Sequence, residues 1–167
     1  MRPACVPRRA CSFPPSNSSS PVLMPADPPS LLFNVCLSDE ELEALMREIR
    51  ASSYIDEINS GEGPREECPM YNEVQPVAAL SSDTSLASLI HASGIRTGCL
   101  VLADDKTPSR HGVKVVHVVK GVRQNDMRVA PRDVIEVCVN VRMANMEMDE
   151  FKALASKTES HVYDSGR

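Results

Sequence analysis

The chain has 167 residues, of which 42% are hydrophobic and 4% aromatic, and its formal net charge is −5. This length suits one domain with an aliphatic core plus a tail, and the scarcity of aromatic rings argues against carbohydrate-binding or base-stacking platforms. Because no uncharged apolar run is long enough to cross a bilayer, we expect no membrane span.

Residues 1–30 are predicted to be a disordered arm. Eight of the thirteen prolines fall within the first 29 residues, together with three arginines and no acid before Asp27. Prolines interrupt helices and strand ladders, and a polar Ser16–Ser20 stretch buries nothing. The acid-poor, arginine-bearing composition also has part of the pattern of a mitochondrial import signal, although the prolines interrupt the amphipathic helix of such a signal. We expect this arm to precede a single domain over residues 31–167.

The first part of the domain is predicted to be acidic and helical. Residues 38–83 contain twelve acidic and three basic side chains. Ser38 and Glu41 have the spacing of a capping box, and apolar residues then recur at helical intervals as far as Ile49. The helix either continues to Ile58 or breaks at Ser52 and Ser53, which are poor residues for a helix interior.

Shorter elements are expected in the middle of the chain. Gly61–Pro69 has the glycine, proline and glutamate content of a solvated loop. Val74–Leu80 is typical of a short strand, and Pro76 restricts it to the edge of a sheet. A helix over Asp83–Ser93, capped by Ser82 or Asp83, should end at Gly94.

The last part of the domain is predicted to be a sheet followed by a helix. Alternating patterns indicate three strands, which are Cys99–Ala103, Val113–Lys120 and Val134–Arg142. The connections between them are too short for a crossover helix, so an antiparallel meander is favoured. A closing helix over Glu147–Lys157 would cover the sheet. The predicted fold class is therefore α+β, with an antiparallel sheet of three to four strands covered by two or three helices.

Basic residues are concentrated in this last part. Residues 106–142 contain eight basic and three acidic side chains. A cationic surface of this kind would contact an acidic protein or several phosphates. The candidate partner-binding or phosphate-binding residues are Lys106, Arg110, Lys114, Lys120, Arg123, Arg128 and Arg132. The alternative is an ordinary solvated face that the acidic helix of the same molecule partly neutralises.

Catalytic and metal-binding signatures have little support. The six cysteines, at positions 5, 11, 36, 68, 99 and 138, show neither zinc spacing nor the density of a disulfide scaffold. They favour a reducing intracellular compartment such as the cytoplasm. Cys99 with His111 or His117 would suit a thiolate enzyme, but a small core cysteine is the simpler interpretation. Asp104, Asp105 and His111 would suit a divalent metal, but a polar turn explains them better.

Three functional hypotheses follow. No glycine-rich phosphate loop or hydrolase motif is present, so we expect no cofactor, no metal and no small-molecule substrate. The favoured hypothesis is a non-catalytic interaction or assembly subunit whose acidic and basic faces contact different protein partners. Met143, Met146 and Met148 would add an adaptable contact surface, or fill the core. The alternatives are an RNA-associated protein of the ribosome-bound type and, third, a cysteine-dependent enzyme.

Overall fold

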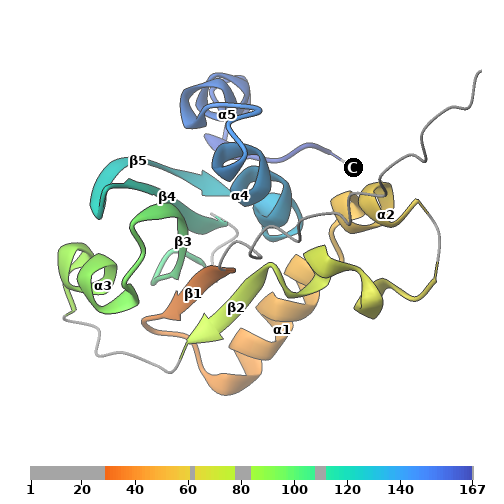
Figure 1. Cartoon of the computed structure of the whole chain (residues 1–167), viewed down its shortest axis with the longest axis horizontal. Helices are drawn as coiled ribbons and strands as arrows, with labels where there is room; N and C mark the ends of the chain where they lie inside the picture. The colour runs from red at the N-terminus through yellow and green to blue at the C-terminus, as the bar shows by residue number, and fades with distance from the viewer. Residues whose placement is uncertain (1–28, 61–62, 78–83, 108–111, 167) are drawn as a thin grey trace, which may run out of the picture.

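The computed structural model describes residues 29–60, 63–77, 84–107 and 112–166, which form a mixed six-stranded sheet with helices on both faces (Figure 1). The strands are β1 (Ser30–Asn34), β2 (Val74–Val77), β3 (Thr97–Ala103), β4 (Val113–Val119), β5 (Val122–Val129) and β6 (Val162–Tyr163). The α-helices are α1 (Asp39–Arg50), α2 (Ser53–Asn59), α3 (Leu86–Ser93), α4 (Val134–Arg142) and α5 (Met148–Ala155). Short 3₁₀ helices are η1 (Arg65–Glu67), η2 (Pro69–Asn72) and η4 (Pro131–Asp133).

The α+β class is confirmed, but the expected sheet is wrong in strand number and direction. The order is β2-β1-β3-β4-β5-β6. β1 runs parallel to β2 and β3, and β5 runs parallel to β6. Of the predicted meander, only the antiparallel pairing of Cys99–Ala103 with Val113–Lys120, now β3 and β4, is confirmed, and the antiparallel neighbour that follows β4 is β5 rather than Val134–Arg142. Most of the predicted arm lies in residues 1–28, outside the described residues.

The two faces of the sheet are covered unequally. On one face, α1, α2, α4 and α5 form the larger core, in which Ile49, Ile135 and Phe151 meet Val101 and Val115 of the sheet. On the other face, α3 is the one described helix that packs against the sheet, in a smaller core. This smaller core contains Phe33, Leu89, Ile90, Leu100, Val116 and Val118.

The local signals in the first half of the domain predict its structure well. Ser38 and Glu41 form a complete capping box at the start of α1. The helix ends at Arg50 with Ala51 as its C-cap, and α2 begins at Ser53. This confirms the expectation of a helix break near Ser52 and Ser53. β2 is an edge strand that contains Pro76.

The remaining helices agree with the prediction except at their caps. α3 ends at Gly94 in the left-handed conformation, as expected, but its N-cap is Ser85 rather than Ser82 or Asp83. α5 lies within the predicted closing helix and has a capping box formed by Glu147 and Glu150. None of the helices in the described ranges is long and apolar enough to cross a bilayer.

The predicted strand over Val134–Arg142 is wrong, because this segment is helix α4. Six of its nine residues are buried, so the helix has almost no polar stripe. Only Glu136 and Asn140, four positions apart, and Arg142 at the end of the helix are partly exposed. Buried β-branched residues on nearly every side produce an alternating sequence that imitates a strand.

Three strands were not predicted. β5 lies inside the segment Gly121–Asp133 that was expected to be a connection, and it pairs with β4 along its whole length. β1 and β6 pair in parallel with segments distant in sequence. β4 itself is central, as its two apolar faces indicated: Val113 and Val115 lie in the larger core, whereas Val116 and Val118 lie in the smaller one.

Candidate interaction surface

A tight turn joins β4 to β5 at one end of the sheet. Its two residues, Lys120 and Gly121, have positive φ angles of 54° and 74°. Such angles match a two-residue hairpin turn to the twist of its strands. The amide of Gly121 donates a 2.8 Å hydrogen bond to the carbonyl of Arg96, just before β3. The turn therefore holds Arg96 beside Lys120.

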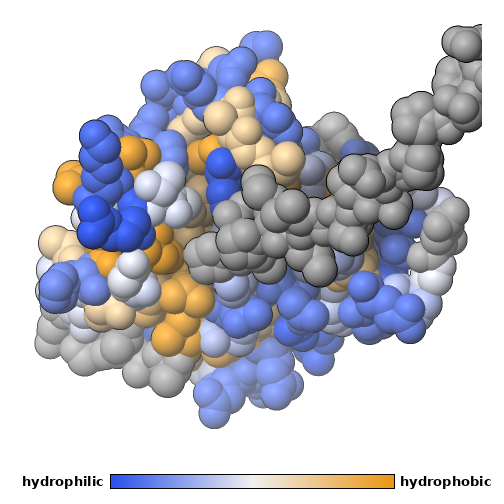
Figure 2. Space-filling view, in the orientation of Figure 1, coloured by the Kyte–Doolittle hydropathy of each residue, from blue (hydrophilic) through white to orange (hydrophobic). Residues whose placement is uncertain are grey.

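An open groove with a volume of about 410 Å³ lies between this turn and α3, and we call it the hairpin groove. Its lining residues are Leu86, Ala87 and Ile90 from α3 and Gly121, Val122 and Arg123 from the hairpin. Val122 is 59% exposed, whereas Ile90 is buried. In Figure 2, hydrophobic and strongly hydrophilic residues lie side by side over this part of the molecule. The groove thus combines an apolar floor with charged neighbours.

The charge around the hairpin groove is positive. Arg96 and Lys120 are exposed, and neither has an ion-pair partner among the described residues. Nη2 of Arg123 lies 2.5 Å from Oδ2 of Asp126, and the same oxygen lies 3.7 Å from Nζ of Lys114. A single carboxylate therefore faces two cations, and excess positive charge remains at this end of the sheet.

Acidic residues lie elsewhere in the molecule. Residues 84–103, which include all of α3 and β3, contain no acid. The first turn of α1 contains three, Asp39, Glu40 and Glu41. α1 packs in the larger core and α3 in the smaller core on the opposite face of the sheet, and Figure 1 shows α2 at the far side of the molecule from α3 and the hairpin turn. The charge separation along the sequence is therefore also a separation in space.

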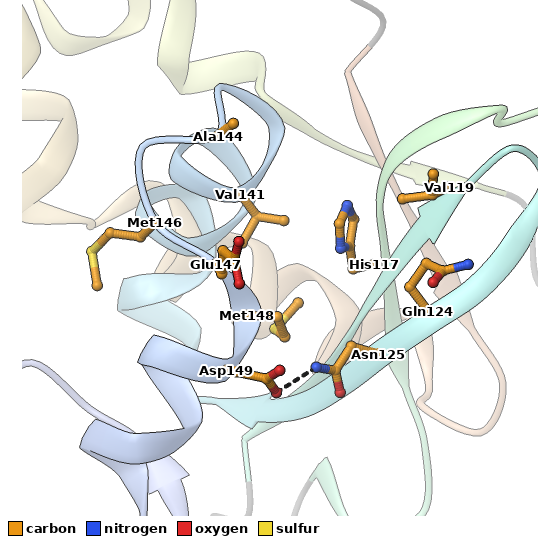
Figure 3. Close-up of a pocket in the computed structure, with 10 residues that line it drawn as sticks. All are labelled: His117, Val119, Gln124, Asn125, Val141, Ala144, Met146, Glu147, Met148 and Asp149. Atoms are coloured by element: carbon orange, nitrogen blue, oxygen red, sulfur yellow. Dashed lines mark hydrogen bonds between the residues drawn. The ribbon is translucent and has the colours of Figure 1, made fainter.

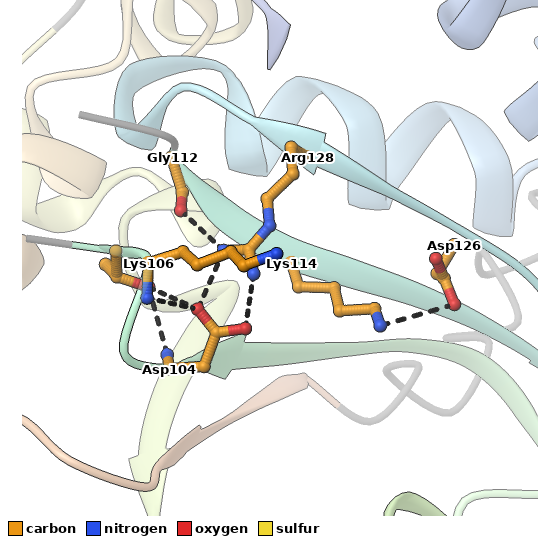
Figure 4. Close-up of polar contacts among 7 residues, drawn as sticks. Asp104, Lys106, Gly112, Lys114, Asp126 and Arg128 are labelled. Carbon is orange, nitrogen blue, oxygen red and sulfur yellow. Dashed lines mark hydrogen bonds and ion pairs between the residues drawn. The ribbon is translucent and has the colours of Figure 1, made fainter. Parts of the chain in front are cut away.

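A second group of polar residues lies at the opposite end of β4 (Figure 4). Nη1 of Arg128 donates hydrogen bonds to Oδ1 of Asp104 at 2.8 Å and to the carbonyl of Gly112 at 3.0 Å. Nη2 of the same guanidinium donates to Oδ2 of Asp104. The carboxylate also accepts from the amide of Lys106 at 3.2 Å. This cluster joins the loop after β3 to β5 across the start of β4.

The cluster stabilises the charged form of Asp104. Partial burial by itself raises the pKa of this carboxyl group. The hydrogen bonds and charge of Arg128, with the amide of Lys106 and the hydroxyl of Thr107, outweigh burial and hold the pKa below its ordinary value. Asp104 therefore belongs to a satisfied turn and ion pair, as the polar-turn interpretation expected.

The predicted binding residues divide between the two ends of β4. Lys120 and Arg123 adjoin the hairpin groove, and Lys114 shares Asp126 with Arg123. Lys106 and Arg128 lie at the far end. Arg132 is exposed in η4, and Arg110 lies outside the described residues. Consecutive connections of an antiparallel meander lie at opposite ends of the sheet, which is why these cations do not form one surface.

A second candidate ligand site lies at the carboxyl ends of the parallel strands β1 and β3. α1 follows the carboxyl end of β1 on one face of the sheet, whereas β3 is followed by antiparallel β4, so the two connections do not form the crevice that binds ligands in many α/β proteins. The side chain of Asn34 forms hydrogen bonds with the backbone of Cys36 and Leu37. Asp104 is engaged by Arg128. The polar groups at this point are therefore occupied by structural contacts.

The candidate cysteine site is not assembled in the described residues. Cys99 is 3% exposed, and its Sγ lies 3.9 Å from the carbonyl of Cys138 in the larger core. His117 is the residue of β4 paired with Cys99, but it lines a separate pocket (Figure 3). His111 lies outside the described residues, and the described ones contain no cluster of three or more metal-ligating side chains.

Sequence reasoning missed Arg96 and the apolar floor of the groove. Arg96 is separated from Lys120 by the whole of β3 and β4, and only the register of the two strands brings them together. The available signal was the absence of acids from residues 84–103. Val122, an apolar residue directly after Gly121 in an otherwise polar stretch, was a second signal.

Comparison with known proteins gives a family but no activity. A family model described as "Domain of unknown function (DUF6924)" matches residues 30–165. No curated protein and no solved structure matches the chain significantly.

Proposed function

Because the chain belongs to the DUF6924 domain family, whose description names no activity, we propose a function from its own surface. The protein is a non-catalytic interaction subunit that binds an acidic, apolar segment of a partner protein in the hairpin groove. The observation that carries this proposal is one groove lined by exposed Val122, the apolar side of α3 and Arg123, with the exposed cations Arg96 and Lys120 beside it.

The two components of the groove have different tasks. Burial of apolar side chains against Leu86, Ile90 and Val122 supplies binding energy, as apolar anchors do at the centre of protein interfaces. The surrounding cations attract and orient a partner of opposite charge. A partner segment with large apolar residues and flanking aspartates or glutamates satisfies both components.

A protein partner fits this surface better than RNA does. Lys114 and Arg128, which belong to the predicted phosphate-binding set, each contact a carboxylate of the same chain, so phosphates would have to compete for them. The groove has no aromatic residue on which a base would stack. The RNA-associated hypothesis is therefore kept as an outcome of the test.

A catalytic role has less support than binding. The thiol on which a cysteine enzyme would depend, Cys99, is buried in the larger core and does not line the groove. Among the described residues that line the groove, Arg123 is the one titratable side chain. Binding without chemistry is the simpler use of such a lining.

Peptide selection tests the proposal. A random peptide library displayed on phage is selected on the full chain, and enriched peptides are measured by fluorescence anisotropy. We expect peptides that combine acidic with large apolar residues, and affinity about tenfold lower for Val122→Asp and for Arg123→Glu. Lys157→Glu, which makes the same charge change as Arg123→Glu at an exposed position after α5, should bind like wild type.

Two results would overturn the proposal. One is enrichment of peptides without acidic residues, or affinity that the groove variants leave unchanged. The other is tighter binding of a single-stranded RNA than of any selected peptide, with a steep decrease in salt, which would instead support the RNA-associated hypothesis.

A further inference from the structure

A second pocket lies on the opposite face of the hairpin, between β4–β5 and the turn that joins α4 to α5 (Figure 3). Its volume is about 370 Å³. We call it the methionine pocket, because Met146 and Met148 contribute to its wall with Val141. Met148 is buried, and Met143 nearby is 61% exposed. The methionine run thus serves in part as core and in part as accessible surface.

The charged groups that line this pocket are both acidic. They are Glu147 and Asp149, at the start of α5. Val141 and Ala144, at and just after the C-terminal end of α4, line the same pocket; the partial negative charge of this helix end and the partial positive charge at the start of α5 offset each other, so the two carboxylates set the charge of the pocket. The nearest basic residue of α4, Arg142, pairs with Glu73 instead. The pocket is therefore electronegative.

His117 does not offset this charge at neutral pH. Burial lowers the pKa of its imidazole below the ordinary value, so the ring is neutral there. In Figure 3 the ring projects between Val141 and the β5 side chains. A neutral imidazole offers a hydrogen-bonding group without repelling a cation.

The chain already holds one ammonium group at the edge of this pocket. Nζ of Lys152 contacts Oδ1 of Asn125 and lies 4.0 Å from Oδ1 of Asp149. The amide of Asn125 donates a 2.6 Å hydrogen bond to the same carboxylate. Lys152 reaches Asp149 from the α5 side, which leaves Glu147 and the thioether wall without a cation among the described residues.

We propose that the methionine pocket binds an alkyl cation, which is an ammonium or guanidinium group on an unbranched aliphatic stem. The stem lies against Met148 and Val141, where polarizable and apolar atoms suit methylene groups, whereas the side chain of Met146 points away from the pocket (Figure 3). The cationic head lies between Glu147 and the end of α4. An anion would be repelled by Glu147 and Asp149, and a wholly apolar ligand would remove water from the Glu147 carboxylate without supplying a counterion.

Side-chain analogues test this inference. The full chain, with methyl-labelled methionines, is titrated by NMR with agmatine and with lysine capped at both backbone ends. The capped lysine whose side-chain amine is acetylated serves as the neutral control. We expect saturable shifts of Met148 with both cations, and weak or no shifts with the acetylated compound. Equal affinity indicates recognition of head and stem alone, and tighter binding of capped lysine indicates a polypeptide source. Both results support the inference.

Matched variants locate the binding. Glu147→Gln with Asp149→Asn keeps the shape of both side chains and should lower affinity about tenfold for each cation. Asp39→Asn with Glu40→Gln makes the same charge change on α1 and should leave affinity unchanged. Ala144→Lys places a tethered cation at the pocket and should abolish binding even if the first pair impairs folding. Circular dichroism checks each fold.

The inference is overturned if neither cation produces a saturable shift. It is also overturned if the acetylated compound binds as tightly as capped lysine, or if the α1 variants weaken binding as much as the pocket variants do. The hairpin-groove variant Val122→Asp should bind both cations normally, so this test is independent of the proposed peptide site.

Discussion

Arg128 of β5 and Asp104, the first residue after β3, form a two-pronged ion pair that reaches across the start of β4. Both side chains are largely shielded from solvent, with exposed fractions of 20% and 25%. The same guanidinium donates a hydrogen bond to the carbonyl of Gly112. The pair therefore links three consecutive strands at the end of the sheet opposite the hairpin groove.

Substitution of Asp104 should produce a loss of stability that depends on pH. We expect Asp104→Asn to lower the free energy of unfolding by about 1 to 2 kcal/mol at neutral pH, measured by urea denaturation. The folded-state pKa of Asp104 lies below its ordinary value, so the contribution of the pair is fully present above the unfolded pKa. It is lost as pH falls through the folded pKa.

The comparison of two pH values checks this sign. The difference between wild type and Asp104→Asn should shrink as the pH falls below the ordinary pKa of an aspartate and through the lower folded-state pKa of Asp104, where the carboxyl group takes up a proton. A difference that stays constant between neutral and acidic pH would contradict the assignment of the loss to this ion pair.

Gly112 should tolerate no side chain. Its φ angle is +66°, and an added Cβ would lie 2.2 Å from the carbonyl oxygen of Val129. We expect Gly112→Ala to cost about 3 kcal/mol or more, measured by thermal and urea unfolding.

Gly121 is the matched control, because its φ angle is +74° but nothing lies within 4 Å of an added Cβ. Gly121→Ala should cost only about 1 to 2 kcal/mol. Equal losses of stability at the two positions would show that the backbone shifts to relieve the clash with Val129, and would contradict this prediction.

The fold was predictable where local chemistry determines it. The capping box at Ser38, the proline in β2 and the glycine after α3 each act within a few residues, and all three lie where the sequence indicates. α4 was missed because a helix buried on most sides loses the polar stripe that marks a helix. β5 was missed because its apolar residues are few and its opposite face carries the paired charges Asp126 and Arg128.

The candidate surface was predictable only in part, for a related reason. Lys120 and Arg123 are in the predicted set and adjoin the groove. Lys114 and Arg128 are in the same set, but each contacts an acid of a neighbouring strand or loop, which becomes visible only when β5 is paired with β4. The apolar floor comes from α3, which meets the hairpin through tertiary packing rather than through any sequence pattern.

The buried ion pair between Glu73 and Arg142 should couple β2 to α4. Glu73 is 6% exposed, its Oε2 lies 3.0 Å from Nη2 of Arg142, and its Oε1 accepts a hydrogen bond from Ser30 at 3.1 Å. Removing one charge leaves the other buried without its counterion, so Arg142→Met should cost about 3 kcal/mol. Arg142→Met with Glu73→Gln should cost clearly less than the sum of the single variants, as a double-mutant cycle of urea unfolding measures. Additive losses would contradict the coupling.

Thiol labelling should separate a buried cysteine from a reactive one. Cys36 is exposed, whereas Cys68, Cys99 and Cys138 are buried. Burial, and then the negative charge of Asp104, raises the pKa of the Cys36 thiol, so its labelling by a maleimide or disulfide reagent should be slow and should accelerate with pH.

In a chain with Cys5 and Cys11 replaced by serine, we expect Cys36 to react first at neutral pH. Cys99 should react at least about a hundredfold more slowly, at the rate at which the core opens. Peptide mapping of the labelled sites measures this order, and Cys36→Ser should remove the fast phase. Faster labelling of Cys99 than of Cys36 in the folded protein would contradict the non-catalytic proposal and favour a cysteine-dependent enzyme.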